Sequence, residues 1–152
     1  MRQVSNIIWD TPSNLFEWPS SSPAANMLIQ DIMVTVPPAW GPTALPLFAL
    51  AFPAGLTQSL IRHIKIYNPD YKGFGVSGID MGLVSDTNEV VSCVLWLLTG
   101  TGVRIGKGSE IRVSNGRVIS LGAKESPAGA IGIHVTGNNG ALPRTPHFDC
   151  SS

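Results

Sequence analysis

IRVSNGRVIS, residues 111–120, contains the clearest turn signal of the chain. Its central dipeptide, Asn115-Gly116, is typical of a two-residue type I′ β-hairpin, because both central positions of that turn need a positive φ. Val113 before the dipeptide and Val118 after it alternate with polar residues, which is the period of a half-buried strand. The stretch therefore predicts two antiparallel strands joined by a tight turn.

Other segments of the chain also have the composition of short β-strands. Residues 27–36 and 60–67 alternate apolar and polar side chains and end at proline-containing turns. Residues 130–137 alternate in the same way, and residues 90–98, which are almost wholly apolar, predict a central strand covered on both faces. Residues 43–52 fit either a buried strand or a short helix.

These segments predict one all-β domain. The chain has 152 residues, with 16 glycines and 12 prolines, and its pattern shows neither an amphipathic helix nor an internal repeat at a fixed period. We expect an antiparallel sandwich or a jelly-roll-like barrel. The sandwich domain would span residues 26–137, between an extended N-terminal arm at 1–25 and an irregular, proline-rich C-terminal tail at 138–152.

The charge of the chain restricts its classes of partner. Charged residues make up 13% of the chain and the formal net charge is zero, which argues against a nucleic-acid-binding protein and favours a protein packed against other proteins. The N-terminus has no secretory signal pattern, and no apolar stretch reaches the length of a transmembrane helix. We expect a soluble protein, made without export, that binds neither membrane nor nucleic acid.

The sequence motifs point to no particular reaction. The stretch GVRIGKGS at 102–109 has the wrong spacing for a phosphate-binding loop, so its glycines are interpreted as turn residues. Cys93 lies in an apolar run, which predicts an inert buried thiol, and we expect both Cys93 and Cys150 to be free. Four loop acids could supply a carboxylate pair for glycoside hydrolysis, although solvated turn acids are the simpler interpretation. These acids are Asp70, Asp80, Asp86 and Glu89.

The histidines and the basic residues could form sites of other kinds. His63, His134 and His147 lack the close spacing of metal ligands, and the short cluster of His147, Asp149 and Cys150 is the one weak metal pattern. We expect no metal, no cofactor and no enzymatic activity. A mildly basic patch is possible in the second half of the chain, although a solvated face or a subunit contact is the simpler interpretation. Its members would be Arg104, Lys107, Arg112 and Arg117.

The predicted arm contains the best candidates for contact with a partner. Trp9, Phe16 and Trp18 lie in it, and burial of such side chains is worth on the order of 2 kcal/mol each. They are therefore expected to be buried, either against their own domain or against a neighbouring subunit. The functional prediction uses the second arrangement, in which the three aromatic side chains anchor the arm on a partner.

Residues 51–137 also carry an ordered series of strand and turn patterns. A Pro-Ala-Gly turn precedes an I-x-I-x-N strand, and a G-S-x-I-x-V strand and a closing apolar strand follow. The matching residues are Pro53, Ala54, Gly55, Ile64, Ile66, Asn68, Gly108, Ser109, Ile111, Val113, Ile131, Ile133 and Val135. This order resembles small virion structural proteins of tailed bacteriophages. The resemblance implies a β-sandwich with a capsid-associated or tail-associated role and no catalytic residues to carry over.

We therefore predict a non-enzymatic virion structural protein, specifically a capsid decoration or cement protein that stabilises a phage-like shell through subunit contacts. Its partners would be the major capsid protein or other virion proteins, with homo-oligomeric or lattice contacts, in a virion assembled in the host cytoplasm. The alternative is a receptor-binding or carbohydrate-binding β-module of a phage tail. In that case Tyr67, Tyr71 and Phe74 would form a stacking platform for the ligand.

Overall fold

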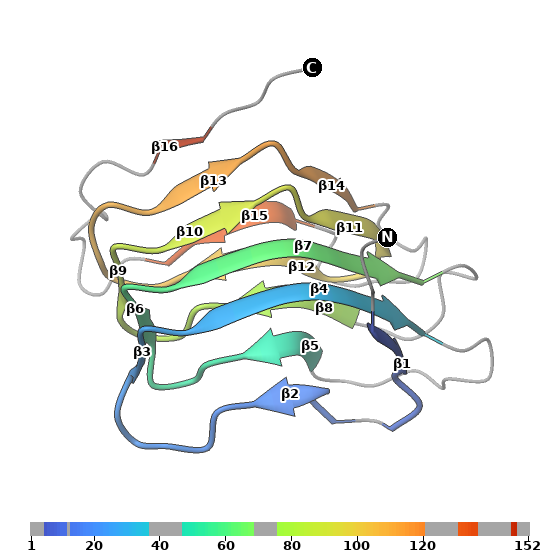
Figure 1. Ribbon diagram of the computed structural model, residues 1–152, viewed down its shortest axis with the longest axis horizontal. Coiled ribbons are helices and arrows are strands. Elements are labelled where there is room, and N and C mark those ends of the chain that lie inside the picture. Colours follow the sequence, from blue (N-terminus) through green and yellow to red (C-terminus); the bar gives the residue numbers. More distant parts are fainter. Residues whose placement is uncertain are drawn as a thin grey trace.

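The computed structural model describes residues 5–11, 13–36, 47–68, 76–120, 131–136 and 147–148. Within these ranges the chain forms β-strands and no helix, so the all-β prediction is confirmed there. The strands stack in successive turns of a β-solenoid (Figure 1). The predicted antiparallel sandwich or jelly-roll-like barrel is wrong, because all the described strand pairs are parallel.

The turns of the solenoid, called rungs below, are built from three sheets, and sheet C has strands in the first three rungs. Sheet A contains β1 (Ser5–Ile8), β4 (Leu28–Thr35), β7 (Leu60–Tyr67), β10 (Glu89–Val91), β11 (Val94–Leu98), β13 (Arg112–Ser114), β14 (Arg117–Ser120) and β16 (His147–Phe148). Sheet B contains β2 (Phe16–Glu17), β5 (Leu47–Ala51), β8 (Val76–Asp80), β12 (Thr101–Ile105) and β15 (Ile131–Val135). Sheet C contains β3 (Ala24–Ala25), β6 (Leu56–Thr57) and β9 (Ser85–Asp86).

The rungs have unequal lengths. Equivalent positions at the start of the sheet A strands are separated by 32, 29 and 23 residues. These positions are Leu28, Leu60, Glu89 and Arg112. Most of the difference arises in the connection from sheet A to sheet B, which comprises residues 36–46, 68–75 and 99–100 in successive rungs. Unequal connections at one corner hide the repeat from a search at a fixed period.

Two stacks of residues with positive φ bend successive rungs at the same places. The first stack lies between sheet C and sheet A and consists of Asn26, Gln58, Thr87 and Glu110. The second stack lies within sheet A and consists of Asp31, His63, Ser92 and Asn115. In the first stack, the backbone N–H of Gln58 donates to the carbonyl of Asp86, and that of Thr87 donates to the carbonyl of Ser109. Hydrogen bonding between rungs therefore continues through the bends.

Asn115-Gly116 belongs to the second stack and does not form the predicted hairpin. β13 before the dipeptide and β14 after it pair in parallel with β10 and β11, so the chain keeps its direction. Asn115 has a φ of 51° but Gly116 has no positive φ, whereas a type I′ turn needs positive φ at both positions. The hairpin prediction is wrong, and the dipeptide makes a bend within sheet A.

Apolar side chains from successive rungs stack in columns inside the solenoid. One column of sheet A contains Ile29, Ile61, Val90 and Val113, and one column of sheet B contains Leu50, Ile79 and Val103. Full burial of one such side chain stabilises the fold by roughly 1.5 to 3 kcal/mol relative to exposure. The alternation that predicted strands at 27–36 and 60–67 therefore marks the inward and outward faces of sheet A, where β4 and β7 lie.

Two buried polar side chains connect the rungs where sheet C leads into sheet A. The Oγ of Ser59 accepts a hydrogen bond from the N–H of Met27 at 3.0 Å, and the Oδ1 of Asn88 accepts one from the N–H of Ser59 at 3.1 Å. The Nδ2 of Asn88 donates to the carbonyl oxygen of Leu56 at 2.5 Å. Where the chain turns from sheet C into sheet A it leaves regular sheet pairing, and these bonds satisfy its backbone N–H and carbonyl groups there.

A glycine allows two rungs to approach closely near sheet C. A Cβ on Gly108 would lie 1.2 Å from the carbonyl oxygen of Ser85, so no other residue fits there without moving the backbone. Next to this contact, Val84 and Lys107 form an isolated parallel bridge. Gly108 is therefore a position of close backbone approach.

The predicted arm and tail both contribute strands to the same solenoid. In the described part of residues 1–25, β1, β2 and β3 form the first rung, at the bottom of Figure 1, and pair with β4, β5 and β6. In the predicted tail, β16 pairs with β13.

Candidate functional site

Large exposed apolar side chains occur on the first two rungs, on sheet A at both ends of β4 and on sheet B near β2. Ile8 on β1 is 64% exposed and Leu28 on β4 is 57% exposed. Phe16 on β2 and Trp18 just after it are 40% and 36% exposed. We call these four residues the first-rung surface.

An apolar cavity opens beside the first-rung surface. Its volume is about 320 Å³, and its lining is almost entirely apolar. The lining residues are Ile7, Leu15, Phe16, Ile29, Ile32, Val34, Leu50 and Ile64. They come from the first three rungs, so the cavity lies at the first-rung end of the hydrophobic core. The side chains of the first rung do not fill this end of the core completely.

The strands of the first rung also have free edges among the described residues. β1, β2 and β3 each pair with one described strand, on the side of the second rung. The edge of a parallel strand presents backbone N–H and carbonyl groups that can pair with another strand. Free edges, exposed apolar side chains and an apolar cavity therefore occur together at this end of the solenoid.

The three aromatic residues predicted to contact a partner have different environments. Trp9 is fully buried in the chain's own core, and its Nε1 donates a hydrogen bond to the carbonyl of Ser13 at 2.8 Å. Phe16 packs against Phe52, with ring centroids 6.0 Å apart, but stays partly exposed. Phe16 and Trp18 are therefore available for contact, whereas Trp9 stabilises the first rung itself.

The described loop acids do not converge. Asp80 ends β8 in sheet B, Asp86 ends β9 in sheet C, and Glu89 begins β10 in sheet A, so the three carboxylates lie on three sheets. Asp70 lies outside the described residues. The arrangement does not provide the facing carboxylate pair that glycoside hydrolysis requires.

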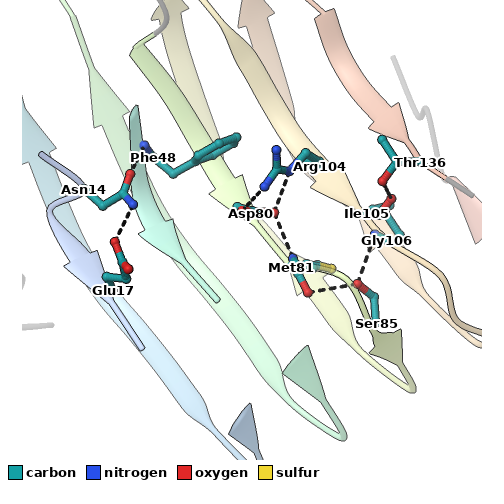
Figure 2. A network of polar contacts seen from close by, with 11 residues as sticks. Asn14, Glu17, Phe48, Asp80, Met81, Ser85, Arg104, Ile105, Gly106 and Thr136 are labelled. Carbon is teal, nitrogen blue, oxygen red and sulfur yellow. Dashed lines mark hydrogen bonds and ion pairs between the residues drawn. The ribbon is translucent and has the colours of Figure 1, made fainter. Parts of the chain in front are cut away.

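Asp80 and Asp86 also have structural partners. Figure 2 shows the Asp80 carboxylate held by the Arg104 guanidinium, with a 2.8 Å bond from Nε of Arg104 to Oδ1 and an ion pair through Oδ2. The same Oδ1 accepts the N–H of Gly82 at 2.8 Å. Oδ1 of Asp86 accepts the N–H of Ser109 at 3.1 Å and the Ser109 hydroxyl at 2.5 Å. Both carboxylates therefore link successive rungs.

Cys93 is a buried free thiol, as predicted. Desolvation by burial raises the pKa of the Cys93 thiol from 9.0 to about 11, which is opposite to the change that activates a nucleophilic cysteine. Cys150 lies outside the described residues. Among the residues that the structure describes, no group of three His, Cys, Asp or Glu side chains could hold a metal ion.

The basic residues proposed as one patch lie on separate parts of the solenoid. Arg112 and Arg117 belong to sheet A, Arg104 belongs to sheet B, and Lys107 pairs with Val84 near sheet C. Arg104 is further engaged with Asp80. The four side chains therefore do not form one surface.

The sequence did not predict that Trp96 is exposed. The apolar run at 90–98 predicts a strand covered on both faces, but Trp96 on β11 is 39% exposed on the outer face of sheet A. It packs against Tyr67, one of the predicted platform residues, with ring centroids 5.4 Å apart. Tyr71 and Phe74 lie outside the described residues.

Comparisons of the chain with protein-family models, curated proteins and solved structures found no match. The geometry alone therefore defines the class of this protein, a parallel β-solenoid with an apolar first-rung surface. In the described ranges, no helix is long and apolar enough to cross a membrane.

Proposed function

We propose that this chain is a non-enzymatic virion structural protein that acts by binding another subunit of the particle through the first-rung surface. The observation that carries the proposal is the coincidence of free strand edges, exposed apolar side chains and an apolar cavity at one end of the solenoid. The virion assignment rests on the resemblance of residues 51–137 to phage structural proteins, although the β-sandwich that this resemblance implies is not the fold of the chain. A decoration or cement role is the form of this proposal that we favour.

The binding partner that fits the first-rung end of the solenoid is a subunit with β-strands. Its strand edges would pair with β1 and β2, and its apolar side chains would fill the cavity of about 320 Å³ beside Ile7 and Leu15. Removal of the exposed parts of Ile8 and Leu28 from water would favour binding by roughly 1 to 2 kcal/mol for each side chain. Many weak contacts of this kind, repeated over a shell, would give high avidity.

The dispersed acids and the inert thiol support a non-enzymatic role. Asp80 and Asp86 are bound to Arg104 and Ser109, and Cys93 is buried. These groups stabilise contacts between rungs, so association is the function that the described surface supports best.

The experiment is co-sedimentation of the purified chain with particles of its source phage from which the protein has been stripped. We expect the chain to rebind, and the double variant Ile8→Lys/Leu28→Lys to lose binding about tenfold or more, because lysine places charge against an apolar partner. Leu83→Lys is the matched control, because Leu83 is 63% exposed but lies outside the first-rung surface. Equal binding by the double variant and the wild type would contradict the proposed surface, and failure of the wild type to rebind would contradict the virion role.

A further inference from the structure

The outer face of sheet A carries an aromatic pair with two cations nearby. Trp96 on β11 is opposite Tyr67 on β7, and their rings pack at a centroid distance of 5.4 Å and an interplanar angle of 44°. Two residues earlier along the same strands, Lys65 is opposite Val94, and Val94 is opposite Arg117 of β14. The parallel register thus fixes four side chains around one point, which we call the Trp96 site: Lys65, Tyr67, Trp96 and Arg117.

The register also sets the spacing of the Trp96 site. Neighbouring strands lie about 4.8 Å apart, and alternate residues of one strand lie roughly 6.6 Å apart. Lys65 and Arg117 are therefore both diagonal neighbours of Trp96, on opposite sides, with Cα atoms at roughly 8 Å. This spacing suits one pyranose ring over the indole, with its charged substituent facing a cation.

The charges around the Trp96 site are unevenly distributed. The Nζ of Lys65 lies over the Tyr67 ring, 6.0 Å from its centroid, and Arg117 is exposed. The described acids of sheet A are farther along the strands. Asp31 contacts His63 at 3.4 Å, and Glu89 is opposite Arg112. The Trp96 site therefore combines an exposed aromatic surface with two positive charges.

We propose that the Trp96 site binds an acidic glycan, a saccharide chain whose sugars bear carboxylate groups. The apolar C–H face of a pyranose ring would pack on Trp96, as apolar groups do on aromatic rings. A sugar carboxylate would then accept charge-assisted hydrogen bonds from Arg117 on one side or Lys65 on the other. This inference is independent of the proposed association, because it uses the outer face of sheet A and none of the first-rung surface.

The test is isothermal titration calorimetry of the full chain with a hexamer of galacturonic acid, with maltohexaose as the neutral control. We expect the acidic hexamer to bind, with affinity that falls as salt rises, and maltohexaose to bind at least about tenfold more weakly. Trp96→Ala and the double variant Lys65→Met/Arg117→Met should each weaken binding of the acidic hexamer by about tenfold or more. Arg112→Met, an exposed arginine of the same sheet, should change it by less than about twofold.

Each other outcome overturns the proposal. Absence of binding of the acidic hexamer at about 5 mM excludes an acidic glycan, and equal binding of maltohexaose excludes recognition of its charge. Hexaglutamate binding as tightly as the acidic hexamer would mean that the surface recognises anions, or an acidic peptide, without a saccharide. If circular dichroism shows that Trp96→Ala does not fold, the binding measured for the double variant Lys65→Met/Arg117→Met tests the proposal. Its two side chains lie on the surface of sheet A, so their replacement should leave the fold intact.

Discussion

Replacement of Asn88 by alanine is expected to remove a polar connection between two successive rungs. The Asn88 side chain is fully buried, accepts the N–H of Ser59 at 3.1 Å and donates to the carbonyl of Leu56 at 2.5 Å. Alanine would leave both backbone groups buried without these partners. An unsatisfied buried polar group costs about 1 to 3 kcal/mol, so the variant should lose about 2 to 6 kcal/mol of unfolding free energy.

This loss is large compared with the stability of an ordinary domain, about 5 to 15 kcal/mol. The assay is urea unfolding of the full chain, followed by far-ultraviolet circular dichroism and compared at equal m-values. Glu89→Ala is the control, because Glu89 is the next residue and is exposed, and it should change stability by less than about 0.5 kcal/mol. A loss below about 1 kcal/mol for Asn88→Ala would refute the assignment of Asn88 as an essential link between rungs.

Two further predictions concern Gly108 and Cys93. Gly108→Ala should prevent folding or lower the midpoint of thermal unfolding sharply, because its Cβ would lie 1.2 Å from the carbonyl oxygen of Ser85; a midpoint equal to that of the wild type would contradict the close approach. Because burial raises the pKa of Cys93 to about 11 from 9.0, the unfolded chain loses this proton first as pH rises. The neutral buried thiol therefore contributes roughly 2 to 3 kcal/mol to the free energy of unfolding below pH 9, and this contribution is lost as the pH rises toward 11. Urea titrations at pH 8 and pH 10.5 should therefore show a smaller loss for Cys93→Val than for the wild type, and equal losses would contradict a buried neutral thiol.

The positions of several strands could be predicted from the sequence, but their direction could not. Alternation at 27–36 and 60–67 identifies a strand with one buried face, and β4 and β7 lie there. The same alternation occurs in parallel and antiparallel sheets, so it does not distinguish a solenoid from a sandwich. Asn115 contributed to the wrong hairpin prediction. Asparagine tolerates the left-handed conformation that a type I′ hairpin needs, and the bend within sheet A uses the same conformation.

The candidate surfaces were predictable only in part. Phe16 and Trp18 are large apolar side chains in a segment of unusual composition, which predicts a contact role, and they are partly exposed. Trp9 has the same chemistry but lies in the core. Composition alone does not show whether a residue faces the core or the solvent, so this difference could not be predicted. Trp96 was missed because Leu95 and Leu98 beside it are apolar and buried, so the run shows no alternation. The Trp96 site depends on the register of β7, β11 and β14, which no local pattern contains.

The most direct test of the proposed function is hydrogen–deuterium exchange of the backbone amides in residues 5–18, measured for the free protein and for the protein on its particle. The free edges of β1 and β2 should exchange quickly when the protein is free and become protected on the particle, because the partner's strands pair with them. Peptides around Leu83, away from the first-rung surface, should exchange at the same rate in both states. Equal exchange of residues 5–18 in both states would contradict association through the first rung.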